Sequence, residues 1–168
     1  MNKLESGEVR FLSVPFEMEP LLHEIDPVLQ SQASENGVQL KTQYSAEPLH
    51  LIGSPAHIKQ ILINIANNAL KYTPAGGTVS VQVQAVEQDA DTMNVTFRCT
   101  DTGIGMSEQF LKHAFEPFTQ ENRGARTSYS GTGLGLPIVK KLVDRMGGSI
   151  QLSSQLGKGT VVTICIRF

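Results

Sequence analysis

One predicted helix carries side chains that could bind a metal ion and phosphate. Asn64, Asn68 and Lys71 are spaced four and then three residues apart, so they share one face of that helix. Asparagine is a mediocre helix former because its amide competes for backbone hydrogen bonds, so the NIANN run requires a positional reason. A carboxamide oxygen can ligate Mg²⁺, and a lysine can neutralise phosphate oxygens. The alternative is a polar helix edge that faces water.

Two glycine-rich segments could shape a pocket for a nucleotide. In DTGIG, residues 101–105, the Asp101 carboxylate follows an apolar strand and could accept a hydrogen bond from an exocyclic amine, while the glycines let a flat ring approach the backbone. The same Asp-x-Gly pattern is common in ordinary turns. The GTGLGL segment, residues 131–136, leads into a helix whose unpaired N-terminal N–H groups attract anions. It is not a Walker loop, because no Gly-Lys-Ser/Thr follows, and Leu136 stands where the dinucleotide pattern has its third glycine.

Hydrophobic periodicity predicts the elements that would position these residues. The strongest helix begins at Ser54 and Pro55, with Ser54 as its cap, and ends by Thr73. Further helices are predicted for residues 15–37, 108–115 and 137–146, and strands for residues 38–45, 49–53, 78–86, 93–101, 149–155 and 160–168. The third and fourth of these strands are expected to form a hairpin through the acidic tip EQDAD. Residues 119–130 contain almost no aliphatic side chains, so we expect this segment to be mobile.

The composition is that of a globular domain. At 168 residues, with 40% hydrophobic and 18% charged residues, the chain is long enough to bury one core. A net charge of −2 gives no basic field for nucleic acid or an anionic membrane, and no apolar run approaches the about 20 residues that span a bilayer. Cys99 and Cys165 lie in alternating apolar runs, and we expect both thiols to be buried, in a reducing compartment. Ordinary polar positions without metal-ligand spacing are expected for His50, His57 and His113.

Four motifs, taken in order, resemble those of a known family. The Asn-rich helix, the DxGxG turn, the FEPF segment and the GxGxG loop resemble the N, G1, F and G2 boxes of sensor histidine kinases, within the wider gyrase, Hsp90, histidine kinase and MutL ATPase superfamily. The resemblance runs from about Pro55 to the C-terminus, and KLESG is similar to the usual exit from a preceding dimerisation helix. It implies an α/β two-layer sandwich, the Bergerat ATP-binding fold, in which a mixed, largely antiparallel sheet packs on about three helices beneath a mobile ATP lid. Residues 1–10 would be the end of the dimerisation helix and a linker, and residues 11–168 the catalytic ATP-binding domain.

The resemblance assigns roles to residues by position. Asn68 would ligate Mg²⁺, and Asn64 would line the same site. Lys71 would contact phosphate, and Tyr72 would pack against adenine. Asp101 would accept a hydrogen bond from the adenine amine. The residues that shape its pocket and the lid would be Gly103, Gly105, Gly131, Thr132, Gly133, Leu134, Gly135 and Leu136.

Five further residues each have two interpretations. Phe115 and Phe118 match the F box that anchors the lid, and both are equally suited to a core. Arg123 and Arg126 could pair with the γ-phosphate or remain solvated charges. Thr160 in GKGT matches a position that often reaches adenine through water, and an ordinary strand threonine explains it as well.

Asn64 separates a kinase from a hydrolase. In ATPases of the superfamily, the residue one turn before the metal-binding asparagine is typically a glutamate that activates water. An amide cannot serve as a general base near neutral pH, so the resemblance implies transfer to an external acceptor, with Asn64 and Lys71 as catalytic residues. His23 in HEIDP has its proline one residue early and lies downstream of KLESG, so we do not expect it to be the acceptor.

The function implied is that of the catalytic domain of a protein-histidine kinase. It would bind ATP and Mg²⁺ and donate the γ-phosphate to a histidine on the dimerisation and phosphotransfer helices of its parent protein, with a response regulator receiver domain downstream. The isolated chain is expected to be monomeric and cytoplasmic, without contacts to nucleic acid or membrane, and the parent protein could be anchored in the inner membrane. The alternatives are a nucleotide-binding regulatory module without transfer activity and a serine kinase of the anti-sigma type.

Overall fold

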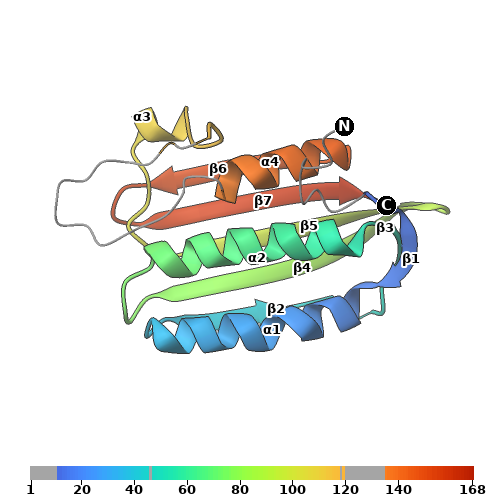
Figure 1. The fold of residues 1–168 in the computed structure, drawn as a ribbon, viewed down its shortest axis with the longest axis horizontal. Helices are drawn as coiled ribbons and strands as arrows, with labels where there is room; N and C mark the ends of the chain where they lie inside the picture. Colours follow the sequence, from blue (N-terminus) through green and yellow to red (C-terminus); the bar gives the residue numbers. More distant parts are fainter. Residues whose placement is uncertain (1–10, 46, 118, 120–134) are drawn as a thin grey trace, which may run out of the picture.

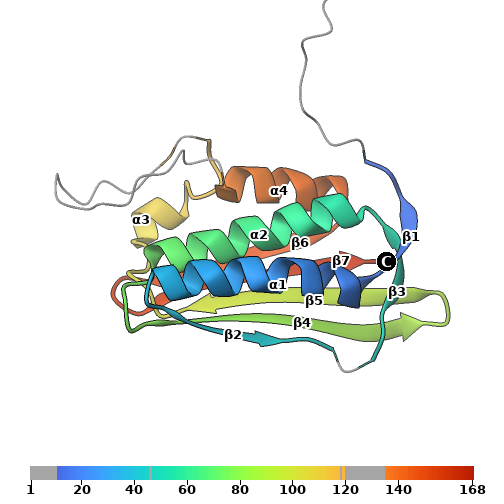
Figure 2. The same cartoon turned by 60° about the horizontal axis from the view of Figure 1, so that its bottom comes forward.

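A five-stranded sheet, covered on one face by long helices, forms most of the molecule (Figures 1 and 2). The computed structural model describes residues 11–45, 47–117, 119 and 135–168. Its strands are β1 (Val14–Glu17), β2 (Gln39–Gln43), β3 (His50–Gly53), β4 (Thr78–Asp89), β5 (Thr92–Asp101), β6 (Ser149–Gln155) and β7 (Gly159–Arg167). Its helices are α1 (Met18–Glu35), α2 (Pro55–Tyr72), α3 (Glu108–Leu111) and α4 (Gly135–Arg145). None of these helices is long and apolar enough to cross a membrane.

The sheet is mixed, and its inner face supplies one side of the core. Its order is β2-β4-β5-β7-β6, with β2 parallel to β4 and the other neighbouring pairs antiparallel. Val79, Val81 and Val83 of β4 alternate with polar residues, and at most 1% of each valine is exposed. Phe97 on β5 and Ile164 on β7 are paired in register and continue this apolar layer. The predicted two-layer α/β sandwich with a largely antiparallel sheet is confirmed.

Helix α2 lies between α1 and α4 on the covered face of the sheet (Figures 1 and 2). Pro55 is its first residue, where the missing N–H would have had no partner inside the helix. Its apolar residues recur at helical spacing and face the core, and Ile58 and Leu62 are fully buried. Because this stripe is fixed against the core, the polar face that begins at Asn64 lies toward the other side of the helix.

Ser54 occupies the predicted N-cap position of α2, but its side chain does not cap the helix. Its Oγ lies 2.6 Å from Nδ1 of His57 instead, and each of the two residues is only 2% exposed. The ring centroids of Phe11 and His57 are 5.2 Å apart. The expectation that His57 is an ordinary polar position is therefore wrong, because its hydrogen bond with Ser54 satisfies two polar groups inside the protein.

Other departures from the sequence-based expectations have structural reasons. A helix is predicted from residue 15, whereas β1 occupies Val14–Glu17 and α1 begins at Met18. This four-residue strand exists through its antiparallel pairing with β3, which no local pattern reveals. Helix α4 begins at Gly135, two residues before the predicted start. Cys99 is buried as expected, but Cys165 is exposed because the alternation along β7 places it on the outer face.

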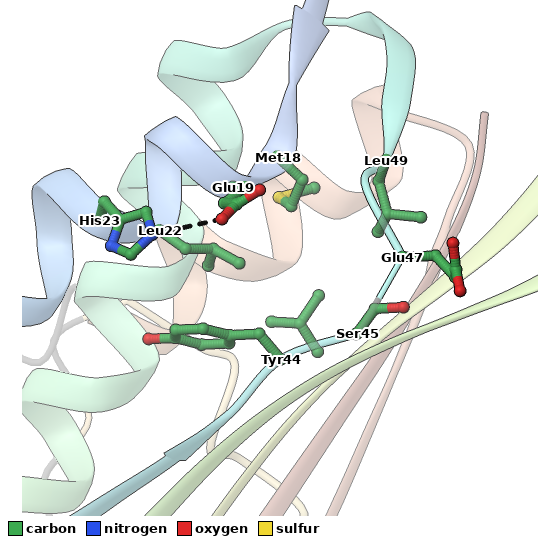
Figure 3. Close-up of a pocket in the computed structure, with 9 residues that line it drawn as sticks. Met18, Glu19, Leu22, His23, Tyr44, Ser45, Glu47 and Leu49 are labelled. Atoms are coloured by element: carbon green, nitrogen blue, oxygen red, sulfur yellow. Dashed lines mark ion pairs between the residues drawn. The ribbon is translucent and has the colours of Figure 1, made fainter.

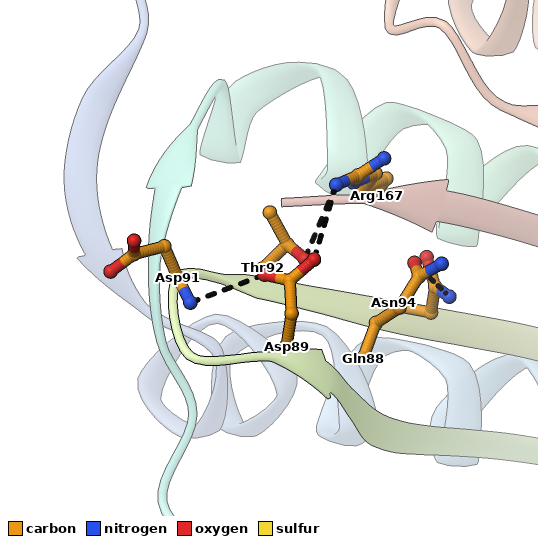
Figure 4. A network of polar contacts seen from close by, with 6 residues as sticks. All are labelled: Gln88, Asp89, Asp91, Thr92, Asn94 and Arg167. Carbon is orange, nitrogen blue, oxygen red and sulfur yellow. Dashed lines mark hydrogen bonds and ion pairs between the residues drawn. The ribbon is translucent and has the colours of Figure 1, made fainter.

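The β4–β5 hairpin extends past its neighbours, and polar contacts close its tip (Figures 1 and 4). Both strands run further than predicted, to Asp89 and from Thr92, with an irregular register just before Asp89. A hydrogen bond from Thr92 lowers the pKa of Asp89, and Nη2 of Arg167 lies 3.5 Å from the same carboxylate. Since these groups are exposed, they define the geometry of the tip and add little stability.

The buried stripe of α2 predicts a large cost for the loss of one side chain. Leu62→Ala changes a residue with 0% exposure, so we expect the free energy of unfolding to fall by about 2 to 5 kcal/mol. Ile52→Ala on β3, where 68% of the residue is exposed, should change it by at most about 0.5 kcal/mol. Chemical denaturation measures both values, and equal losses would show that α2 does not anchor the core.

Candidate functional site

Three segments meet at the end of the sheet where β5 ends (Figure 1). They are the end of α2, the loop that follows β5, and the turn between β6 and β7. The amide of Ile104 donates to the carbonyl of Tyr72 at 3.0 Å, and the amide of Gly157 donates to the carbonyl of Ile104 at 2.8 Å. The loop therefore lies between α2 and the β6–β7 turn, and the structure brings the DTGIG motif to the end of the helix that carries NIANN.

Asp101, the last residue of β5, is a buried carboxylate with two backbone donors. Only 9% of the residue is exposed, and its Oδ1 accepts from the amides of Gly103 at 2.8 Å and Thr160 at 3.2 Å. Burial raises the pKa of Asp101 above its usual 3.8, and the two amide bonds oppose that rise. Among the described residues nothing donates to Oδ2, so this oxygen can accept a hydrogen bond from a ligand.

Close approaches of the loop require glycine at two positions. A Cβ at Gly103 would lie 2.8 Å from Oδ1 of Asp101 and would overlap the carbonyl of Tyr72. Gly105 has a φ of 65°, and a Cβ there would overlap the carbonyl of Gln155. The two glycines therefore let the loop pass between the end of α2 and the end of β6.

The polar face of α2 carries oxygen donors that fit a hard cation. Asn64, Asn68 and Lys71 are each partly exposed. Asn67 adjoins them, and its Oδ1 is buried without a hydrogen-bond partner in the described part of the chain. A Cβ at Gly135, the first residue of α4, would lie 3.2 Å from Oδ1 of Asn68, so a larger residue would press on this carboxamide. Carboxamide oxygens suit Mg²⁺, and the N–H groups of a helix N-terminus suit phosphate.

Lys71 and Tyr72 end α2 beside the DTGIG loop. Nζ of Lys71 lies 5.1 Å from the centroid of the Tyr72 ring, within the range of a cation–π contact. Both side chains are partly exposed. The hydrogen bond from Ile104 to the Tyr72 carbonyl fixes the backbone here, so the two side chains start from a defined position next to Asp101.

The structure describes only the end of the predicted glycine loop. Gly135 and Leu136 begin α4, and Leu136 is 9% exposed, so its side chain packs inward and only its backbone could face a ligand. Phe115 is partly buried, next to the more deeply buried Ala114. Seven of the residues that the sequence assigns to the site or its lid lie outside the described part of the chain: Phe118, Arg123, Arg126, Gly131, Thr132, Gly133 and Leu134.

Thr160 and Ser154 extend the site onto β7 and β6. Thr160 is 8% exposed, and its Oγ1 lies 2.8 Å from Oγ of Ser154. Oγ of Ser154 also accepts from the amide of Met106 at 2.8 Å and donates to the carbonyl of Gly159 at 2.9 Å. Sequence reasoning singles out Thr160 and misses Ser154, because nothing in SIQLSSQ separates this serine from its neighbours. Only the register of β6 on β7 brings it to Thr160.

A cavity of about 270 Å³ lies elsewhere, between the first turn of α1 and the β2–β3 connection (Figure 3). Core side chains form its floor, and its rim includes His23, whose Nε2 lies 3.5 Å from Oε1 of Glu19. Burial raises the pKa of Tyr44 on its wall to about 12, and the Tyr44 hydroxyl donates to Asp26. None of the described residues that the sequence assigns to a nucleotide lines this cavity, so we place the candidate site at Asp101.

Two exposed histidines, His50 and His113, each lie close to a glutamate carboxylate. Nδ1 of His50 is 3.3 Å from Glu17, and Nδ1 of His113 is 2.9 Å from Glu116. Within the described ranges, no group of three or more His, Cys, Asp or Glu residues could hold a metal ion. A metal site at the carboxamides of α2 would therefore depend on oxygen atoms supplied jointly by the protein and a ligand.

Residues 53–168 match the family described as histidine kinase-, DNA gyrase B-, and HSP90-like ATPase. Sensor histidine kinase GacS of Pseudomonas protegens is 35% identical over 167 residues, which cover 99% of this chain and 18% of that protein. Autoinducer 2 sensor kinase/phosphatase LuxQ of Vibrio harveyi is 33% identical over 98% of this chain and 19% of that protein. The chain therefore spans about a fifth of the length of these relatives.

Solved structures share the fold. Full-length ShkA in complex with AMPPNP is 28% identical, with a TM-score of 0.75 over 92% of this chain and 30% of that one. The catalytic domain of histidine kinase ThkA superposes with a TM-score of 0.71 over 92% of this chain and 94% of that one, at 24% identity. The second similarity concerns the fold alone, and it extends over nearly the whole of that domain.

The raised pKa of Asp101 predicts how stability depends on pH. In the pH range where the folded protein retains the Asp101 proton and the unfolded chain has lost it, raising the pH lowers the free energy of unfolding. Asp101→Asn removes this titration, while the amide oxygen can still accept from Gly103 and Thr160. The free energy of unfolding of the variant, relative to the wild type, should rise from pH 3.8 to the raised pKa and then level off.

Chemical denaturation across this pH range measures the difference between the two proteins. Asp91→Asn, at the exposed hairpin tip, controls for the loss of one negative charge. A difference for Asp101→Asn that stays constant, or that falls as the pH rises, would contradict the buried carboxylate.

Proposed function

Because the chain belongs to the family of histidine kinase-, DNA gyrase B- and HSP90-like ATPases, we propose that it binds Mg²⁺-ATP and donates the γ-phosphate to a histidine on a separate dimerisation domain. The observation that carries the proposal is the buried Asp101 carboxylate, which keeps one acceptor oxygen for a ligand, in a loop that is bonded to the end of α2. The sensor kinase relatives support phosphotransfer in two-component signalling. Since the chain spans about a fifth of their length, the activity of the parent protein is part of the proposal.

Adenine would bind at the end of the sheet. Oδ2 of Asp101 would accept a hydrogen bond from the exocyclic amine of the base, because Oδ1 is already bonded to two amides. Glycine at positions 103 and 105 lets the loop pass between α2 and β6, and so determines where the flat ring would lie beside Asp101. The Tyr72 ring would pack against the base from the end of α2.

The triphosphate would lie along the polar face of α2. Asn68 would hold Mg²⁺ through its carboxamide oxygen, with Asn64 one turn earlier, and Lys71 would pair with phosphate oxygens. Bound Mg²⁺ would neutralise charge on the phosphates during transfer. The N-terminus of α4, at Gly135 and Leu136, would add backbone N–H donors to the phosphates.

Asn64 favours transfer over hydrolysis. Its amide has no titratable lone pair near neutral pH, so it cannot take a proton from an attacking water. Catalysis by this chain would rest on holding the γ-phosphate in line with an acceptor and on neutralising its charge through Lys71 and the metal site. The residues proposed for both contributions lie one or two turns apart on α2. One helix would therefore hold the γ-phosphate and neutralise its charge.

The acceptor and the partners would lie outside this chain. We place the acceptor histidine on dimerisation helices of the parent protein and a receiver domain of a response regulator downstream of it. Because ATP is the proposed substrate, we propose that the domain acts in the cytoplasm and that the parent protein could be anchored in the inner membrane. The multidomain length of the sensor kinase relatives is consistent with this arrangement.

Replacement of the proposed metal ligand tests the site. Asn68→Ala should weaken ATP binding in Mg²⁺ by at least about tenfold, because one oxygen ligand is lost. In the presence of a chelator, the variant and the wild type should bind ATP alike. Isothermal titration calorimetry in the two conditions measures this difference.

A matched control is available on the far hairpin. Asn94→Ala removes a side chain that bonds to Gln88 at 2.7 Å, at the opposite end of β5 from Asp101, and should leave ATP binding unchanged. An Asn68→Ala variant that retains the full Mg²⁺ dependence would exclude this ligand. A wild-type chain that binds no ATP would exclude the proposed function.

The reaction is tested by mixing this chain with the dimerisation helices of its parent protein and γ-labelled ATP. We expect the helices to acquire an acid-labile, base-stable label, as phosphohistidine does, and this chain to remain unlabelled. A label on serine would indicate a kinase of the anti-sigma type. ATP binding without any label would indicate a regulatory module.

A further inference from the structure

Ser154, Thr160 and Asp101 form one row across three strands. Asp101 on β5 is paired in register with Thr160 on β7, and Thr160 is paired with Ser154 on β6. Directly paired residues of antiparallel strands project from the same face of a sheet. This is the inner face, because Cys99 and Val162, two residues along their strands, are buried in the core. The row therefore ends the core and lies under the site proposed for adenine.

The hydrogen-bond partners of Ser154 determine where two hydroxyl protons point. A serine hydroxyl has one proton to donate and two lone pairs that accept. Oγ of Ser154 accepts from the Met106 amide at 2.8 Å, and the Gly159 carbonyl, which can only accept, lies 2.9 Å away. The serine proton is thereby committed to Gly159. The 2.8 Å contact between the hydroxyls of Ser154 and Thr160 must then use the threonine proton.

Thr160 is left with accepting capacity on its side chain. Its hydroxyl proton points to Ser154, and its amide proton points to Oδ1 of Asp101 at 3.2 Å. The ionised Asp101 side chain also presents only an acceptor. Two adjacent side chains of the row therefore offer acceptors, and neither offers a donor, to a ligand above them.

We infer that Ser154 is a positioning residue that makes the pocket select 6-amino over 6-oxo purine nucleotides, an inference that rests on the proposed binding of ATP. The exocyclic amine of adenine has two N–H donors, and Asp101 and Thr160 can each accept one of them. A 6-oxo purine places a carbonyl oxygen at the same position, where it would face two acceptors. Without the Ser154 hydroxyl, the Thr160 hydroxyl can turn and donate to that carbonyl.

Calorimetric titration in Mg²⁺ with ATP and with inosine triphosphate, a 6-oxo purine nucleotide, measures two affinities. The affinity for ATP divided by the affinity for inosine triphosphate is the selectivity ratio. The wild type should favour ATP, and Ser154→Ala should lower the ratio about tenfold, as expected for one redirected hydrogen bond. Ser154→Thr keeps the hydroxyl and should restore the ratio. Ser153→Ala makes the same change one residue away, at an exposed position on the opposite face of β6, and should leave the ratio unchanged.

A double-variant cycle separates positioning from a general loss of structure. Thr160→Val keeps the shape of the side chain and the amide bond to Asp101 but removes the hydroxyl. If Ser154 acts through Thr160, Ser154→Ala should cause no further change of the ratio in the Thr160→Val background. The free energy of unfolding of each variant without nucleotide shows whether it is folded.

The possible outcomes distinguish this inference from the proposed function. A wild type without preference for ATP, an unchanged ratio in folded Ser154→Ala, or additive effects in the double variant would overturn the inference and leave ATP binding intact. A wild type that binds neither nucleotide would overturn the proposed function. If Ser154→Ala does not fold, Thr160→Val decides, because the inference requires a lower ratio there and an unchanged ratio overturns it.

Discussion

A single carboxylate oxygen, Oδ1 of Asp101, accepts amide protons from Gly103 in its own loop and from Thr160 on the neighbouring strand. A buried carboxylate is costly unless such donors surround it, and the raised pKa of Asp101 shows that two amides only partly offset its burial. The other oxygen, Oδ2, has no donor among the described residues. Groups perturbed in this way cluster at functional sites, because a ligand can complete their hydrogen bonding.

Helix α2 connects this carboxylate to the rest of the fold. Its apolar stripe is fixed in the core, its last carbonyl accepts from Ile104 in the loop after Asp101, and its Asn68 carboxamide lies against Gly135 of α4. The proposed contacts of Tyr72 with the base, of Asn68 with the metal and of Lys71 with phosphate therefore all start from α2. A displacement of α2 would alter all three contacts together, which is why packing of the helix and the geometry of the site cannot be separated.

The sequence could predict the parts of the site that local pattern determines. The period of α2 placed Asn64, Asn68 and Lys71 on one face, and DTGIG marked the turn after β5, because both depend on residues within one or two turns of each other. The sequence could not predict features that depend on which strands pair and in which register. The strand β1 forms on β3, Cys165 faces outward through the alternation of β7, and Ser154 meets Thr160 through the β6–β7 register. The Ser54–His57 bond likewise depends on burial that the capping pattern does not indicate.

A crystal structure of the chain with Mg²⁺ and a non-hydrolysable ATP analogue measures the central claim most directly. We predict that the exocyclic amine of adenine lies about 2.7 to 3.2 Å from Oδ2 of Asp101 and that the carboxamide oxygen of Asn68 coordinates the metal. A base bound elsewhere, such as in the cavity beside Tyr44, or a metal bound to phosphate without Asn68, would contradict this account.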